Sequence, residues 1–143
     1  YSLDEGGEQK ISISVVSFGF KYGMPKDSDL VFDVRFLPNP HYVSHLKNKT
    51  GQEKEVQDYI LKWPVANNFY DKLFDFIEFL IPEYIKEGKS HLSIAIGCTG
   101  GQHRSVFTAL RLGEFIKDKG YRVVIKHRDI EKKRDKSSQL IEE

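Results

Sequence analysis

Cysteine is almost absent from this chain: Cys98 is the only one among 143 residues. A single cysteine excludes an internal disulfide and a multi-cysteine zinc site, so we expect a reducing, cytoplasmic environment and neither a metal nor a cofactor. Apolar runs that approach the roughly 20 residues of a membrane span are also missing, and so is the pattern of a signal peptide. We therefore expect no membrane partner.

Charge of either sign is not in excess. The 22 lysines and arginines nearly balance the 21 aspartates and glutamates, so the net charge of +1 says little about partners. With 39% hydrophobic and 30% charged residues, the composition is typical of one globular domain. We place this domain at residues 10–136. It follows a polar lead-in at 1–9, which is an interdomain linker or a remnant outside the domain, and precedes a disordered tail at 137–143.

The hydrophobic pattern predicts a single, three-layer-like α/β domain with a small mixed or parallel sheet of about four strands, flanked by helices. Strands are expected at 10–18, 30–36, 91–97 and 121–127. Helices are expected at 44–49 (a short turn), 53–61, 67–81 and 104–119. Pro64 should end the second of these helices. Pro82, inside or just after the third, should either kink it or make it restart through residues 84–86.

The most informative segment is a glycine-rich loop, residues 98–105 (CTGGQHRS), between the strand at 91–97 and the helix at 104–119. Glycines let successive backbone N–H groups converge on one point, and a helix N-terminus adds partial positive charge. The guanidinium of Arg104 can clamp phosphate oxygens. The segment therefore predicts an anion site made by Thr99, Gly100, Gly101, Gln102, His103, Arg104 and Ser105.

Other polar residues follow the carboxyl ends of the predicted strands. In open α/β sheets these ends meet at one edge, where ligands bind. We expect a convergent pocket there. Its cationic side chains and histidines would be Lys21, Arg35, His41, His103, Arg104 and His127. Asp33 also reaches this edge, where it either joins the site or simply pairs with Arg35.

The spacing of Cys98 and Arg104, Cys-x5-Arg, matches cysteine-dependent phosphatases. That chemistry needs a thiolate activated by the loop amides and a general acid for the leaving group. No mobile-loop aspartate stands out upstream, and Gly97 stands where those phosphatases carry histidine. The spacing thus favours phosphate binding, with a phosphohydrolase using Cys98 and Arg104 as the alternative.

Positive charge gathers near the end of the chain. Between residues 121 and 136, seven lysines and arginines face three acidic residues. A basic tail is the usual footprint of a phosphate backbone or another acidic partner, although the same pattern fits a solvated tail of alternating charges.

Four motifs together resemble the RapZ/YvcJ family of bacterial RNase adapters and nucleotide-binding proteins. They are residues 18–23 (FGFKYG), 32–40 (FDVRFLPNP), 97–106 (GCTGGQHRSV) and 127–129 (HRD). The resemblance covers nearly all of residues 12–134 and concerns the family's C-terminal domain. The P-loop motif of the family's N-terminal domain, Gly-x4-Gly-Lys-Ser/Thr, is not found in this sequence.

The resemblance implies a domain that senses glucosamine-6-phosphate or a similar phosphorylated amino sugar and binds small RNAs. Carried over, the sugar site would use Asp33, His41, Ser90, Thr99, Gly100, His103 and Arg104. The RNA surface would use Lys126, Arg128, Lys132, Lys133 and Arg134. Implied partners are a small RNA, an endoribonuclease and the N-terminal P-loop domain, to which ATP or GTP hydrolysis would belong. Self-association into an oligomer is also implied. We expect no catalysis by this domain.

Overall fold

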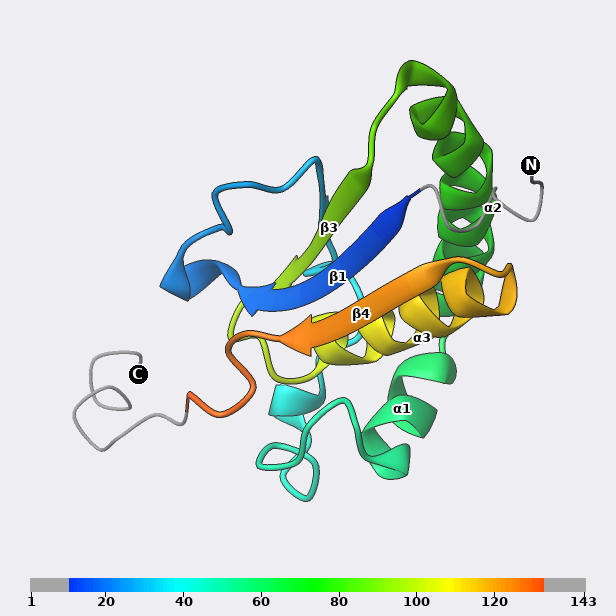
Figure 1. Cartoon of the computed structure of the whole chain (residues 1–143). Helices are drawn as coiled ribbons and strands as arrows, with labels where there is room; N and C mark the ends of the chain where they lie inside the picture. Colours follow the sequence, from blue (N-terminus) through cyan, green and yellow to red (C-terminus); the bar gives the residue numbers. More distant parts are fainter. Residues whose placement is uncertain (1–10, 133–143) are drawn as a thin grey trace.

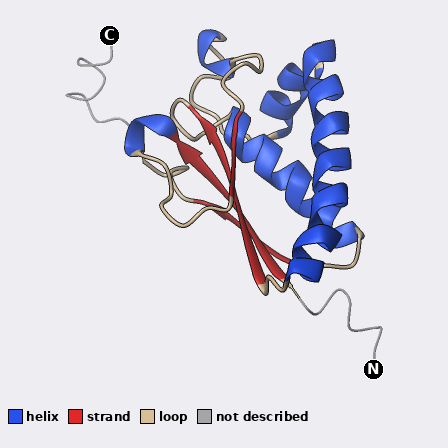
Figure 2. Ribbon diagram, turned by 90° about the horizontal axis from the view of Figure 1, so that it is seen from above, coloured by secondary structure: helices blue, strands red, loops and turns tan. Residues whose placement is uncertain are grey.

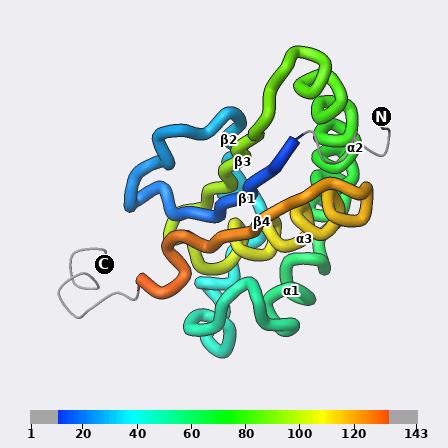
Figure 3. The backbone as a smooth tube through the Cα atoms, viewed as in Figure 1, coloured from blue at the N-terminus to red at the C-terminus, as the bar shows by residue number. Residues whose placement is uncertain are grey.

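The sheet is parallel throughout and has four strands in the order β2-β3-β1-β4. In a computed structural model that describes residues 11–132, the strands are β1 (Ser12–Gly19), β2 (Leu30–Asp33), β3 (His91–Cys98) and β4 (Arg122–His127). Their carboxyl ends lie at one edge of the sheet (Figures 1 and 3). The predicted α/β fold is confirmed. The parts predicted at 1–9 and 137–143 lie outside the described residues.

Three helices flank the sheet: α1 (Lys54–Leu61), α2 (Pro64–Glu87) and α3 (Arg104–Asp118). Figure 2 shows α2 and α3 on the same face of the strands. α3 packs directly on β1, β3 and β4. Within the described residues, no helix is long and apolar enough to cross a membrane.

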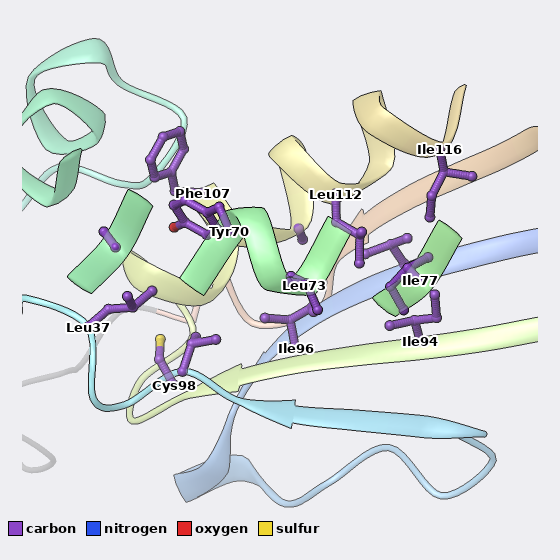
Figure 4. Packing of buried hydrophobic residues seen from close by; sticks show 14 of the residues in the cluster. Leu37, Tyr70, Leu73, Ile77, Ile94, Ile96, Cys98, Phe107, Leu112 and Ile116 are labelled. Carbon is purple, nitrogen blue, oxygen red and sulfur yellow. The ribbon is translucent and has the colours of Figure 1, made fainter. Parts of the chain in front are cut away.

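The core lies between this helical layer and the sheet (Figure 4). Alternate residues of the strands point into it, as the period of two in a strand requires. Ile94 and Ile96 of β3 meet the apolar stripe of α2 and the inner face of α3. The buried helical residues shown there include Tyr70, Leu73, Ile77, Phe107, Leu112 and Ile116.

The predicted restart of the long helix after Pro82 is wrong. α2 is continuous over 24 residues, with Pro64 in its first turn and Pro82 inside it. Pro64 therefore begins this helix as well as ending α1, because proline suits the first helical position. Pro82 is exposed, while the face of the helix that carries Ile77 and Ile81 is buried. Burial of that face holds the helix together despite the missing N–H of the proline.

The second strand is shorter than the predicted 30–36. β2 ends at Asp33, whose carboxylate accepts a hydrogen bond of 2.9 Å from the backbone N–H of Arg35. This local turn draws the chain away from the extended form. The segment 44–49 forms turns and no helix, and two short 3-10 helices, Phe20–Tyr22 and Pro40–Tyr42, were not predicted.

Candidate functional site

The loop after β3 packs against the end of β1 with backbone against backbone. Gly101 has a positive φ of 78°, and a Cβ atom there would lie 2.6 Å from the backbone nitrogen of Gly19. A Cβ on Gly19 would in turn lie 2.5 Å from the carbonyl carbon of Gly100. Only glycine allows so close an approach. These contacts fix the loop beside the carboxyl ends of the strands.

A pocket of about 720 Å³ opens beside this loop. Its volume lies within the range typical of small-molecule sites. Its walls are the loop, the 3-10 helices Phe20–Tyr22 and Pro40–Tyr42, the turns that follow Pro40–Tyr42, and the turn after β4. The lining residues are Lys21, Tyr22, Asn39, His41, Tyr42, Lys47, Asn48, Thr50, Cys98, Thr99, Gly100, Gln102, His103, Arg104, Ile130 and Lys132.

Arg104, the first residue of α3, is only 5% exposed. Its Nη1 donates hydrogen bonds to the carbonyl oxygens of Arg35 and Leu37, the latter at 3.3 Å. Its Nε is buried and has no partner within the described part of the chain. Burial lowers the pKa of Arg104 from its ordinary value, but an arginine remains charged at neutral pH. The guanidinium is thus held by two carbonyls and keeps an unused donor.

His103 lies beside it and is 7% exposed. Its Nε2 is buried without a partner in the described residues. Burial lowers the pKa of His103, while hydrogen bonds to the backbone of Lys49 and Lys47 oppose that shift. The ring is therefore held through its other nitrogen. His103, the N-cap residue of α3, makes no side-chain cap hydrogen bond, so the first N–H groups of the helix lack that partner.

Asp33 and Arg35 reach the same edge of the sheet but do not line the pocket. Nη2 of Arg35 lies 2.6 Å from the carboxylate of Asp33, and its guanidinium lies 4.1 Å from the ring centroid of Phe20. Hydrogen bonding to Arg35 lowers the pKa of Asp33. The two side chains are therefore engaged with each other, while the carbonyl of Arg35 holds Arg104.

The structure does not bring four other predicted residues to the pocket: Ser90, Gly101, Ser105 and His127. Ser90 precedes β3, whose 8 residues place it roughly 25 Å from the loop, at the opposite end of the sheet. Ser105 is fully buried and accepts a hydrogen bond from the thiol of Cys98 at 3.1 Å. His127 is paired with Ser17 at 2.8 Å, and burial lowers its pKa.

The sequence marks the turn after β4 by its charges and by the HRD motif, but does not predict a structural role for Asp129. Asp129, fully buried, accepts a hydrogen bond of 2.8 Å from the backbone N–H of Gly19 and pairs with Arg128 and Lys132. Gln102 of the loop donates to the carbonyl oxygen of Lys132. In the sequence, Asp129 stands among basic residues and cannot be distinguished from a charge of a solvated tail. Only the fold reveals this network.

The predicted RNA residues therefore occupy different settings. Lys126 is exposed on β4. Arg128 is committed to Asp129 and to the carbonyl oxygen of Gly23, at 2.6 Å. Lys132 lines the pocket. Lys133 and Arg134 lie outside the described residues.

One wall of the pocket was missed because it has no regular structure. Lys47, Asn48 and Thr50 belong to the turns before α1. The backbone N–H of Gly51 donates to the carbonyl oxygen of Gln102 at 2.8 Å, which holds this wall against the loop. Gly51 is the residue through which the sequence marks this wall. A Cβ atom there would lie 2.4 Å from the carbonyl oxygen of His103, so the close contact requires glycine.

Comparison with known proteins gives a consistent result. The family model described as the RapZ C-terminal domain matches residues 11–131. A nucleotide-binding protein of Halothermothrix orenii is 64% identical over 126 residues, which cover 88% of this chain and 44% of that protein. Another, from Caldicellulosiruptor saccharolyticus, is 66% identical over 120 residues, 84% of this chain and 41% of that protein. The chain thus spans less than half the length of these curated relatives.

Proposed function

This chain belongs to the RapZ C-terminal domain family, and we propose that it is a non-catalytic sensor domain that binds the phosphate group of a phosphorylated sugar. The loop of residues 98–105 and the start of α3 would hold the phosphate. A phosphorylated amino sugar such as glucosamine-6-phosphate is the ligand that the family resemblance favours.

The observation that carries this proposal is the pair of unused nitrogen atoms at the pocket. Nε of Arg104 and Nε2 of His103 are buried without partners among the described residues. Buried polar atoms are nearly always hydrogen-bonded, and an unsatisfied one costs about 1–3 kcal/mol. A phosphate that reaches these residues would accept from the Arg104 guanidinium and, once Nε2 is protonated, from His103, and the N–H groups that begin α3 would add to its binding.

Isothermal titration calorimetry with glucosamine-6-phosphate, inorganic phosphate and unphosphorylated glucosamine tests the proposal. Both phosphates should bind and glucosamine should not. Arg104→Gln should abolish the binding of both, whereas Arg122→Gln, which changes an exposed arginine at the amino end of β4, should not affect it. Heat signals that are flat for both phosphates would contradict the proposal.

The alternative of a phosphohydrolase gains no support from the geometry. The thiol of Cys98 donates its hydrogen bond to Ser105. Among the described residues that line the pocket there is no aspartate or glutamate to serve as general acid. The arrangement therefore favours holding a phosphate ester over cleaving it.

RNA binding is a further part of the proposed function. Lys126 is exposed on β4, and Lys132 leads to the basic residues beyond the described part. A structured small RNA bound through such residues should lose affinity steeply between 50 and 200 mM salt, because phosphate contacts release counterions. Binding that does not change with salt would contradict it. Lys126→Gln should weaken binding, and Lys54→Gln, on α1, serves as control.

The remaining partners are proposed for the intact protein. We propose that an endoribonuclease receives the bound RNA and that this domain self-associates into oligomers. The relatives are named nucleotide-binding proteins. Because the P-loop motif is not found in this sequence, we assign their nucleotide binding, and any ATP or GTP hydrolysis, to a P-loop domain in the part of those proteins that this chain does not cover.

A further inference from the structure

The long helix α2 carries apolar side chains on a face that the core does not use. Its core-facing residues, such as Leu73 and Ile77, are buried. On another face of the same helix, Phe76 is 49% exposed and Phe79 is 63% exposed. A helix at the surface of a domain normally presents polar side chains to solvent, and a continuous apolar patch in their place marks an interaction surface.

The exposed phenylalanines belong to a stripe with the spacing of a coiled-coil seam. We call it the α2 stripe, and its members, at alternating intervals of four and three residues, are Val65, Phe69, Lys72, Phe76, Phe79 and Glu83. All of them are exposed except Phe69, which is half-buried. The exposed ring of Phe36 widens the stripe, since it lies 5.0 Å from the ring of Phe69. A period of about 3.5 residues allows a second helix to pack along the whole stripe.

The α2 stripe is complementary to an antiparallel copy of itself. We consider two such helices that lie antiparallel about a two-fold axis near Phe74. Phe69 then faces Phe79 of the partner subunit, and the reverse holds by symmetry. Lys72 faces the partner's Phe76, where its ammonium group gains a cation–π contact and its apolar stem covers the ring. Each aromatic ring of the stripe therefore has a partner in the other copy.

The charges near this axis also match. Lys72 and Asp75 are both exposed, and neither forms an ion pair with a described residue. In the antiparallel arrangement each Lys72 lies beside the partner's Asp75, so the two lysines and the two carboxylates neutralise one another. A parallel arrangement would instead set the two lysines against each other. The charges therefore select the antiparallel pair.

We propose that a second copy of this chain docks on the α2 stripe, through an antiparallel pair of α2 helices across a two-fold axis. The inference rests on the self-association proposed above and names its surface. No residue of α2 is among the described residues that line the phosphate pocket, so the dimer leaves the pocket open.

Sedimentation equilibrium of the chain and its variants tests the inference. The wild type should form a dimer in equilibrium with the monomer. Phe79→Asp should weaken dimerisation about tenfold or more, because it places a carboxylate against Phe69 of the partner subunit. Met24→Asp adds the same charge at a 55% exposed apolar residue between β1 and β2, and this matched control should dimerise as the wild type does. Thermal unfolding verifies that both variants are folded.

Charge reversal tests the direction of the two helices. Lys72→Asp and Asp75→Lys should each weaken the dimer, and the double variant should restore it. A double variant no better than the single ones would contradict the antiparallel pair.

The other outcomes separate the two proposals. A wild-type dimer that Phe79→Asp leaves unchanged would overturn the α2 stripe, while self-association would stand through another surface. A wild type that stays monomeric would overturn both. Neither result changes the phosphate site, which fails only if the calorimetric titrations with phosphate compounds are flat.

Discussion

The carboxylate of Asp129 accepts a hydrogen bond of 2.8 Å from the backbone N–H of Gly19, which joins the turn after β4 to the end of β1. Gly101 packs on both partners: a Cβ atom on it would lie 2.6 Å from the nitrogen of Gly19 and 3.1 Å from Cβ of Asp129. The buried carboxylate therefore supports the backbone on which the glycine-rich loop of residues 98–105 rests.

Asp129→Asn should lower the free energy of unfolding by about 2–3 kcal/mol at neutral pH, because the variant loses charge-assisted hydrogen bonds in a buried place. Urea denaturation measures the loss, with the exposed Asp27→Asn as control. A variant as stable as the wild type would contradict the role of Asp129.

The pH dependence of stability follows from the same carboxylate. Burial alone would raise the pKa of Asp129, but hydrogen bonds from Arg128, Gly19 and Lys132 bring it below its ordinary value of 3.8. A lowered pKa stabilises the fold at pH values above that of the unfolded carboxyl group, and this contribution is lost as the pH falls through the lowered value. The stability difference between wild type and Asp129→Asn should therefore shrink below about pH 4.

Three glycine variants should fall in a definite order of stability. Gly101→Ala combines a positive φ with a clash against Gly19 and should be the most destabilising. Gly88→Ala, at φ 100° but with nothing within 4 Å, should cost about 1 kcal/mol through strain alone. Gly100→Ala, in open space at ordinary φ, should leave stability unchanged. Thermal unfolding gives the ranking, and a Gly101→Ala protein no less stable than Gly88→Ala would contradict the close packing.

Phosphate binding should strengthen as the pH falls toward 6. Burial holds the pKa of the free His103 below 6.5, and an anion against its Nε2 raises that pKa, so binding takes up a proton. Affinity then rises as the pH falls through the pKa of the complex and levels off below that of the free protein. Calorimetry on the wild type, on His103→Gln and on the exposed His45→Gln as control measures this pH dependence. The titration of the ligand itself is common to all three proteins and cancels in the comparison. His103→Gln should lose this slope. An unchanged slope would contradict the role of His103.

Cys98→Ser should bind phosphate ligands as the wild type does, because the hydroxyl replaces the thiol as hydrogen-bond donor to Ser105. Neither protein should release phosphate from p-nitrophenyl phosphate. A wild-type turnover that disappears in Cys98→Ser would instead establish the phosphohydrolase.

The sequence predicts the fold well because its signals are local. Strand periodicity and the glycine-rich loop before Arg104 suffice for the parallel α/β architecture. The failures come from tertiary contacts. Pro82 is tolerated because the packed face of α2 includes Ile81, and Asp33 shortens β2 through its own side chain.

The same distinction between local signals and tertiary contacts applies to the site residues. The loop and His103 could be expected from the strand–loop–helix order, whereas the wall around Lys47 depends on irregular turns that no periodicity reveals. Ser90, implied by family resemblance, lies at the far end of β3. Asp129 resembles an ordinary charge of a basic tail until the fold buries it.

The central claim is that the unused nitrogens of Arg104 and His103 receive a phosphate. Nitrogen-15 NMR of the Arg104 Nε–H group during titration with glucosamine-6-phosphate tests this most directly, with the Arg122 Nε–H as internal control. The account predicts a saturable shift of the Arg104 signal and of the backbone amide signals of residues 98–105, while the Arg122 signal stays constant. A resonance of Arg104 that does not move at saturating ligand would contradict the account.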